Sequence, residues 1–418
     1  MSHVDERIII VGGGIGGLAT AIALRQRGCE VAVFEQAQEL REIGAGLSVW
    51  PNATSVLNQF GLLPEVLNRS EVLERLQLRT WKGELLSDIK TVADFETPSV
   101  CMHRADLLSI LKEQIPESCI NLGERLENLE RHDGVVIANF SSGRTVAGHA
   151  LIGADGLNST VRARILGPSK PIYRGYWACR GVAHFALPKQ YSHTAIETWG
   201  SGQRFGIEPM GRGRVFWYAT ANAAEGALGD QPGWKDELRE KFKHWHSPIP
   251  EVIEATEREA ILKHEIVDRR PVRRWGEGRV TLLGDAAHPT TPNLGQGACM
   301  AIEDALVLAQ CLTRKGEMQA RLRKYESLRF KRTEYITRES RRAGRIGQME
   351  NALAVALRSV WLKTLPTFLV DMIHRSYYAR LRPNTSSGCV KSEVVWFDPI
   401  ARVWTNTGNK CSLPLQDV

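Results

Sequence analysis

Features that would mark several protein classes are missing from this 418-residue sequence. Its eight cysteines fall at irregular spacings without a CxxC pair, so they indicate neither a zinc site nor a redox dithiol. No apolar run reaches the roughly 18 residues that a membrane span needs, and no internal repeat is present. With 43% hydrophobic and 24% charged residues, the composition excludes disordered and fibrous classes. We therefore expect a folded protein of two or three domains without a metal site.

The N-terminus also lacks the features of a secretory signal peptide. Asp5 and Glu6 stand before a short apolar run, and neither a basic start nor a cleavage site is present. We therefore expect a cytoplasmic protein with reduced cysteines. The most apolar later stretch, from Leu353 to Tyr378, is broken by charged residues and by Pro366. A packed amphipathic helix pair is the favoured interpretation there, and contact with a membrane surface is the alternative.

The charge balance is moderately basic, with 54 basic and 47 acidic residues and a net charge of +7. The basic residues are densest between Arg314 and Arg345, where a solvated helix face is the simplest interpretation. No nucleic-acid motif accompanies them, so we expect no nucleic-acid partner.

A glycine-rich turn near the N-terminus carries the first chemical signal. Gly12, Gly14 and Gly17 form a GxGxxG motif after a β-branched run, an apolar-periodic helix follows, and Glu35 ends the next β-run. The first glycine permits a tight turn, the second lets the backbone approach a pyrophosphate, and the third allows close packing of helix and strand. Glu35 would accept hydrogen bonds from a ribose. The βαβ pattern therefore predicts a dinucleotide site, for NAD or FAD alike.

The remaining pattern predicts an α/β fold. Short apolar strands at 150–152 and 280–283 each end at an aspartate-containing turn, where open α/β sheets bind ligands. Alternating segments between Ile172 and Ala221, rich in aromatic residues, indicate a second, antiparallel sheet. Helical patterns follow at 298–312 and from Met318 to about Met349.

The segment around the second aspartate resembles a known signature. Residues 280–289, VTLLGDAAHP, with Asn293–Ala298 and Glu303–Ala305, closely resemble the motif of the FAD-dependent aromatic-hydroxylase monooxygenases, the group A or para-hydroxybenzoate hydroxylase-like family. The resemblance implies that Asp285 binds a ribityl hydroxyl of FAD. Gly295, Gly297 and Ala298 would offer backbone N–H groups at a helix start to the flavin ring. Without the surrounding motif, Asp285 would be interpreted as a helix N-cap and His288 as a satisfied core or surface histidine.

Three weaker segments resemble further parts of the family's cofactor site. Residues 153–162, GADGLNSTVR, resemble its DG motif, with Asp155 and Arg162 near the pyrophosphate; otherwise they would be a turn, a cap and an exposed helix arginine. Residues 44–52, including Gly46 and Leu47, resemble the stretch along the flavin ring. Residues 103–107 resemble the segment whose arginine, here Arg104, reaches the FAD phosphates or ribose, and Arg41 is a similar candidate.

The resemblance implies both an architecture and an activity. It predicts a Rossmann-like FAD-binding domain with an inserted antiparallel substrate domain and C-terminal helices. The expected ranges are 1–75, 100–170 and 270–315 for FAD, 76–99 and 171–269 for substrate, and 316–385 for the helices, with 386–418 as an extension of uncertain order. Non-covalent FAD would be reduced by transiently bound NADH or NADPH, and a flavin C4a-hydroperoxide formed with O2 would oxygenate the substrate.

Candidate pocket residues lie in the predicted antiparallel sheet. Arg204 resembles the arginine of urate-hydroxylating relatives and, with Tyr218 and the motif residue Pro289, is our candidate for the substrate site. Gly206 on the same face would leave space for a ligand. Those relatives have tyrosine where Phe216 aligns, which argues against urate. The alternative is that the aromatic residues only pack a sheet and that Arg204 is solvated.

Three functions therefore stay open. The first is hydroxylation of a small aromatic or heteroaromatic substrate, and the second is epoxidation of an isoprenoid or polyene. The third is a non-oxygenating FAD-bearing binding protein or dehydrogenase. A monomer or a homodimer is expected.

Overall fold

The computed structural model describes residues 7–40, 44–91, 95–132, 134–227 and 233–378. The chain divides into two compact units, Met1–Thr364 and Leu365–Val418. The second unit contributes one described helix, α11 (Thr367–Tyr378). Arg41 and the predicted extension 386–418 lie outside the described residues.

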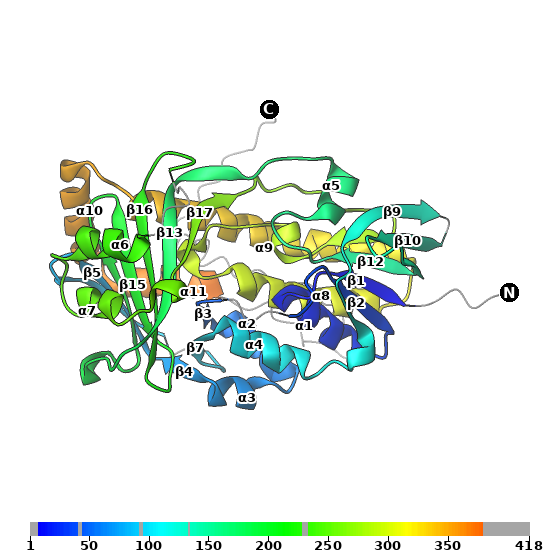
Figure 1. Cartoon of the computed structure of the whole chain (residues 1–418), viewed down its shortest axis with the longest axis horizontal. Coiled ribbons are helices and arrows are strands. Elements are labelled where there is room, and N and C mark those ends of the chain that lie inside the picture. The colour runs from blue at the N-terminus through cyan, green and yellow to red at the C-terminus, as the bar shows by residue number, and fades with distance from the viewer. Residues whose placement is uncertain (1–6, 41–43, 92–94, 133, 228–232, 379–418) are drawn as a thin grey trace, which may run out of the picture. The chain divides into compact units, whose positions relative to one another are not determined.

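A six-stranded, mainly parallel sheet forms the dinucleotide-binding part (Figure 1). Its order is β18 (Gly276–Glu277), β19 (Val280–Leu282), β12 (Ala150–Gly153), β1 (Ile8–Val11), β2 (Val31–Glu35) and β8 (Ile120–Leu122). Only β18 runs antiparallel to its neighbour. The central strands are apolar throughout because both faces of the sheet are covered, and the predicted strands at 150–152 and 280–283 are confirmed.

Different layers cover the two faces of this sheet. Helices α1 (Ile15–Arg25) and α8 (Gly297–Leu312) pack together on one face. A small antiparallel sheet of β9 (Leu126–His132), β10 (Val135–Phe140) and β11 (Thr145–Gly148) covers the other. Phe34 of β2 stacks on Phe140 of β10, with ring centroids 4.4 Å apart. The C-terminal ends of the parallel strands are where open α/β sheets bind ligands.

The predicted second sheet is present and has seven strands. Its order is β17 (Leu262–Asp268), β13 (Ile172–His184), β16 (Arg214–Asn222), β15 (Gln203–Pro209), β14 (Thr194–Trp199), β5 (Arg75–Thr80) and β6 (Leu85–Lys90). Only β14 and β5 pair in parallel. Helices α6 (Trp234–Phe242) and α7 (Ile249–Glu254) cover one face, where Phe205 and Trp217 stack in the core.

The opposite face of the seven-stranded sheet packs against a three-stranded connector. The connector consists of β3 (Gly46–Val49), β7 (Ser99–His103) and β4 (Ser70–Leu73), with α2 (Pro51–Gln59), α3 (Leu63–Asn68) and α4 (Arg104–Lys112) beside it. Ala45 and Cys101 of the connector share a core cluster with Ala195 and Phe216 of the sheet. Ser48 donates a hydrogen bond to Glu208 over 2.7 Å, so polar contacts also join the two sheets.

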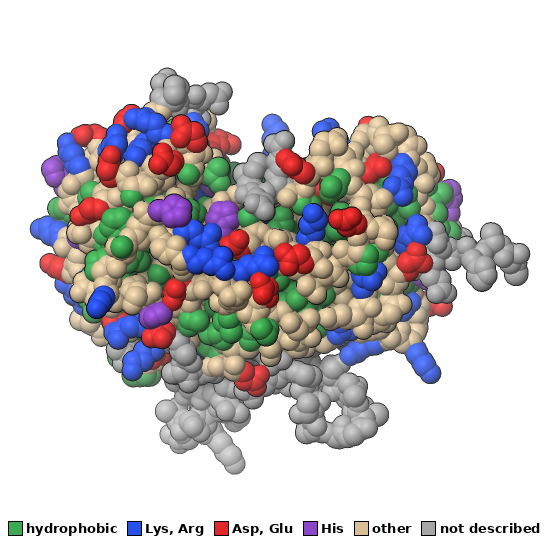
Figure 2. Space-filling view, turned by 60° about the horizontal axis from the view of Figure 1, so that its bottom comes forward, with side chains coloured by type: hydrophobic (Ala, Val, Ile, Leu, Met, Phe, Trp, Pro, Cys, Tyr) green, Lys and Arg blue, Asp and Glu red, His purple; other side chains and the backbone are tan. Residues whose placement is uncertain are grey.

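Long helices complete the first unit. Helix α5 (Thr160–Leu166) follows β12, and α9 (Met318–Gly347) and α10 (Ala352–Thr364) follow α8. Among the described residues no single helix is long and apolar enough to cross a membrane, although α10 and α11 taken together reach that length and composition. Charged side chains of both signs are interspersed on the face drawn in Figure 2.

Candidate active site

The three motif glycines in the loop between β1 and α1 differ in their surroundings. Gly12 has a φ of +111°, and a β-carbon there would lie 2.3 Å from the Ala154 carbonyl oxygen. A β-carbon on Gly17 would lie 1.9 Å from the Gly12 carbonyl oxygen. A β-carbon on Gly14 would meet no atom within 4 Å, and no side chain caps α1 there. The backbone at Gly14 is therefore open to an approaching phosphate.

Glu35 lies at the C-terminal end of β2, beside this loop. Its carboxylate accepts hydrogen bonds from the backbone N–H groups of Gly13, over 2.7 Å, and Ala37, over 3.0 Å. Two of its acceptor positions are thus used to fix the loop. A carboxylate has about four such positions, so capacity for a ribose hydroxyl remains.

Asp155 and Arg162 hold the turn after β12. The Asp155 carboxylate accepts hydrogen bonds from the Ser159 hydroxyl, over 2.5 Å, and the Val161 N–H, over 3.1 Å, while Ser159 caps α5. Burial raises the pKa of Asp155. Arg162 is only 6% exposed, so the alternative of an exposed helix arginine is wrong. It donates hydrogen bonds to the carbonyl oxygens of Ala286 and Ala287 and ties the DG segment to the Asp285 turn.

A buried charge cluster supports the Asp285 turn from behind. Asp285 lies within the 3-10 turn η4 (Gly284–Ala286), not at a helix N-cap. The Asp304 carboxylate accepts hydrogen bonds from the Gly284 N–H, over 3.1 Å, and from His288, over 2.6 Å. Arg329, which is fully buried, pairs with Asp304 over 2.5 Å and with Glu303 over 2.9 Å. His288 is therefore a core histidine, and the cluster fixes the backbone that carries Asp285.

Asp285 itself is exposed, and its surroundings are called the Asp285 recess below. Its side chain keeps solvent contact, yet desolvation by the surrounding protein raises the pKa of its carboxyl, against the lowering effect of His288 and then of Arg104. The carboxylate is therefore accessible from solvent while protein atoms crowd its other sides. A carboxylate at that position can accept hydrogen bonds from the hydroxyl groups of a bound sugar alcohol.

The start of α8 supplies donors beside this recess. Gly295 adopts a left-handed conformation with φ of +60° in front of the helix, and a β-carbon there would lie 2.7 Å from Trp50 Nε1. Gly297 and Ala298 are the first two helix residues, and no side chain caps the helix end at Gln296. Their N–H groups therefore lack intrahelical partners and favour an electron-rich ligand edge. Pro289 is buried between η4 and this helix start.

Strand β3 closes the site from the connector side. Gly46 and Leu47 pair with His103 and Met102 of β7, and a β-carbon on Gly46 would lie 2.2 Å from the Phe216 ring. Glycine is thus needed there because Phe216 packs directly on the strand. Arg104 begins α4, beside Gly44 and close enough to Asp285 to influence its pKa.

These features together suit FAD. Both helix ends facing the site, at Gly14 and at Gln296, lack side-chain caps, and an open carboxylate lies in the recess at Asp285. A dinucleotide can place its pyrophosphate at the first helix end, a ribityl chain at Asp285 and a ring at the second helix end.

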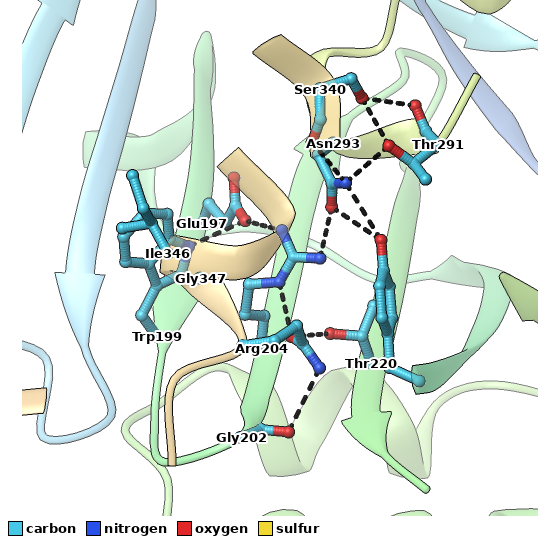
Figure 3. Close-up of polar contacts among 12 residues, drawn as sticks. Glu197, Trp199, Gly202, Arg204, Thr220, Thr291, Asn293, Ser340, Ile346 and Gly347 are labelled. Atoms are coloured by element: carbon cyan, nitrogen blue, oxygen red, sulfur yellow. Dashed lines mark hydrogen bonds and ion pairs between the residues drawn. The ribbon is translucent and has the colours of Figure 1, made fainter. Parts of the chain in front are cut away.

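Arg204 lies inside a hydrogen-bonded network at the far end of the seven-stranded sheet (Figure 3). It is 3% exposed, so the alternative of a solvated arginine is wrong. Its Nε donates to Gln348 over 2.8 Å, one terminal nitrogen to Glu197 over 3.2 Å, and the other to Asn293 over 2.6 Å. Three protein partners hold this guanidinium, and it also lies over the ring of Tyr176 at 5.7 Å from the centroid.

Comparison with known proteins now identifies the family. The sequence profile described as FAD binding domain matches residues 5–340. The aurachin C monooxygenase/isomerase of Stigmatella aurantiaca is 39% identical over 87% of this chain and 95% of that protein. The 6-hydroxynicotinate 3-monooxygenase of Pseudomonas fluorescens is 34% identical over 80% of this chain and 90% of that protein. The chain belongs to the FAD-dependent aromatic-hydroxylase monooxygenases.

A solved structure of this monooxygenase family agrees with the fold. The HpxO protein of Klebsiella pneumoniae, crystallised with FAD and uric acid, superposes with a TM-score of 0.82 and 26% identity, covering 90% of this chain and 98% of that one. The predicted family, α/β fold, FAD cofactor and monooxygenase activity are thereby confirmed. The roles of individual site residues stay predictions.

One expectation about the pocket of this monooxygenase is wrong. Gly206 does share a sheet face with Arg204, but it leaves no space for a ligand. A β-carbon on Gly206 would lie 2.1 Å from the ring of Tyr218, so the neighbouring tyrosine fills that volume. Glycine is required there for packing, and Tyr218 becomes a wall of the site instead.

Sequence reasoning missed the residues that surround Arg204. Asn293 and Gln348 each bond its guanidinium, and Asn293 also bonds Tyr176 and Ser340. Asn293 lies within a segment that resembles the family signature, but nothing in the sequence pairs it with Arg204. A cleft of about 730 Å³ opens beside this network and is lined in part by Tyr176, Asn293 and Gln348, with Arg345 at its rim.

Proposed function

We propose that this FAD-dependent monooxygenase hydroxylates a small aromatic or heteroaromatic compound with NAD(P)H as electron donor and O2 as oxidant. The observation that carries the proposal is the packing of Phe216 on Gly46. It sets one face of the seven-stranded sheet against the strand that resembles the flavin-ring segment of the family. A substrate bound beside this contact would lie next to the ring of FAD.

The chemistry of oxygen transfer comes from the cofactor, since bound FAD accepts a hydride and activates O2. The protein positions the substrate and excludes water from the site. Phe216 and Tyr218 close the sheet side of the site with aromatic rings whose centroids are 6.0 Å apart. Exclusion of water by such a wall limits unproductive release of H2O2.

Tyr218 can also form a hydrogen bond with the substrate. Burial, followed by the negative charges of Glu197 and Glu208, raises the pKa of its phenol well above the usual value. The phenol is therefore neutral at physiological pH and keeps its proton. The hydroxyl hydrogen-bonds Glu197, and its oxygen can accept a hydrogen bond from a ring hydroxyl of the substrate.

The names of relatives support this substrate class. They include the 6-hydroxynicotinate 3-monooxygenase, a 3-amino-4-hydroxybenzoate 2-monooxygenase of Streptomyces cremeus and an FAD-dependent urate hydroxylase of Klebsiella pneumoniae. Epoxidation is the second candidate, because the zeaxanthin epoxidase of Spinacia oleracea is 34% identical. The match spans only 47% of that protein. The larger share of each hydroxylating relative that is covered favours hydroxylation.

A coupled oxidation assay tests the proposal. Purified holoenzyme is mixed with NADH or NADPH and, one at a time, with 6-hydroxynicotinate, 3-amino-4-hydroxybenzoate, uric acid and aurachin C. We expect at least one compound to stimulate NAD(P)H oxidation with equal O2 uptake and an oxygenated product. Stimulation by none, or complete recovery of the oxygen as H2O2, would contradict the proposal.

A further inference from the structure

A second arginine lies on the substrate-facing side of the seven-stranded sheet, and no sequence motif points to it. Arg180 of β13 pairs with Tyr218 of β16, which in turn lies opposite Gly206 of β15. Residues directly opposite each other in an antiparallel sheet share a face. Arg180 therefore lies on the face of Tyr218 and Phe216, which packs toward the connector strands.

Arg180 makes no hydrogen bond or ion pair with any residue that the structure describes. The other arginines of this face are satisfied: Arg204 has three partners, and Arg214 pairs with Asp106 over 3.2 Å. Arg180 is nevertheless largely covered, and desolvation lowers the pKa of its guanidinium. A covered, uncompensated charge is costly, which indicates that its partner comes from outside the chain.

The immediate neighbours of Arg180 supply no negative charge. Tyr218 is a neutral phenol, as argued above. His264 lies opposite Ala178, on the same face as Arg180, and burial together with the charge of Arg180 lowers its pKa to about 4. His264 is thus neutral at physiological pH. Glu197 of β14 lies opposite Gly206. Its carboxylate already accepts hydrogen bonds from Arg204 and, over 2.8 Å, from Trp199.

We propose that Arg180 is a substrate-binding residue that recognises an anionic oxygen, as a carboxylate or ionised hydroxyl on the aromatic ring. The guanidinium can bind such a group through two parallel N–H donors, and Tyr218 and His264 provide neutral hydrogen-bonding groups beside it. This inference rests on the proposed function, because it assigns the substrate class of the same site. Arg180 lies opposite Tyr218 on the sheet face that packs toward the connector. This position favours the substrate, and not the phosphates of FAD, as the partner of the guanidinium.

Binding to the oxidised holoenzyme tests the proposal without turnover. Two probe pairs differ only in the carboxylate: 6-hydroxynicotinate with 2-hydroxypyridine, and 3-amino-4-hydroxybenzoate with 2-aminophenol. Dissociation constants come from perturbation of the flavin absorbance spectrum. We expect the wild type to bind at least one carboxylate about tenfold more tightly than its neutral counterpart, as charge-assisted bonds imply.

Variants then assign the preference to Arg180. Arg180→Gln should raise the dissociation constant of the carboxylate probe by about 10- to 100-fold and leave that of the neutral probe within about twofold of the wild type. Arg180→Lys should retain part of the preference for the carboxylate. Arg214→Gln is the matched control, because this arginine of the same sheet has its own partner in Asp106. The control should keep the wild-type preference.

Three results would overturn the proposal. The wild type could bind no carboxylate more tightly than its neutral counterpart, or Arg180→Gln could keep the full preference. Loss of FAD from Arg180→Gln, measured by the ratio of flavin to protein absorbance, would instead assign Arg180 to the cofactor. Since none of these readouts needs product formation, a failure of the oxygenation proposal is distinguishable from a failure of this one.

Discussion

Arg162 donates hydrogen bonds from one terminal nitrogen to the carbonyl oxygens of Ala286, over 2.9 Å, and Ala287, over 3.1 Å. The two segments are more than 120 residues apart, and each flanks a different part of the recess. The bonds attach the turn that carries Asp285 to the helix that follows the DG segment. Arg162 therefore positions the Asp285 carboxylate, our candidate for binding FAD, without needing to touch the cofactor.

Arg162→Gln should lower FAD affinity although the side chain is buried behind the Asp285 turn. Loss of two charge-assisted hydrogen bonds would loosen the Asp285 turn, and we expect a roughly 10-fold rise in the FAD dissociation constant. Ultrafiltration of the reconstituted protein measures it. Arg164→Gln, in the same helix but with an exposed side chain, is the control, and Asp285→Ala sets the largest loss. An unchanged dissociation constant in Arg162→Gln would refute the positioning role.

Two glycines of the nucleotide loop should fail in different ways. Gly17→Ala should lower the unfolding temperature, because its β-carbon would overlap the Gly12 carbonyl oxygen at 1.9 Å. Gly14→Ala meets no atom within 4 Å and should fold normally. It should still bind FAD more weakly, because its methyl group would occupy space next to the phosphate position. Thermal denaturation of the apoprotein and FAD titration separate the two effects. Normal FAD affinity in Gly14→Ala would contradict the prediction that the FAD phosphates bind beside that loop.

Asp304→Asn should destabilise the protein by about 3–5 kcal/mol, because it leaves the buried Arg329 with an incomplete set of negative partners. Desolvation raises the pKa of Asp304, but His288 and Arg329 outweigh it and lower the value to about 2. Since this folded value lies below the ordinary one, the stabilisation is present above about pH 4 and is lost as the pH falls through 2. Urea denaturation at several pH values measures the difference, and a difference that grows toward pH 2 would contradict this account.

Arg204→Lys should affect stability as well as substrate binding. Lysine cannot reproduce a fork that reaches Gln348, Glu197 and Asn293 together, so we expect a loss of about 1–3 kcal/mol. Substrate KM and H2O2 release should rise while FAD content stays normal. A raised KM with wild-type stability would mean that Arg204 acts mainly through direct substrate contact.

Local patterns predicted the elements well, because periodicity and glycine spacing depend on neighbouring residues. The β1–α1–β2 unit, the strand before Asp285 and the helix from Gly297 all lie where the sequence predicts them. Contacts between distant segments could not be predicted in this way. Nothing near Arg162 indicates that it bonds Ala286, and the space at Gly206 is filled by a residue of another strand. Arg180 was missed because the sequence does not show that it makes no hydrogen bond or ion pair with the described residues.

In the proposed reaction, one atom of O2 enters an aromatic substrate at a site between the FAD-binding part and the seven-stranded sheet. Reaction of the holoenzyme with NAD(P)H and a stimulating compound under 18O2, followed by mass spectrometry of the product, tests it most directly. We predict that the product carries one 18O atom and that H2 18O supplies none under 16O2. A product labelled from water, or oxidised without gain of oxygen, would contradict the claim.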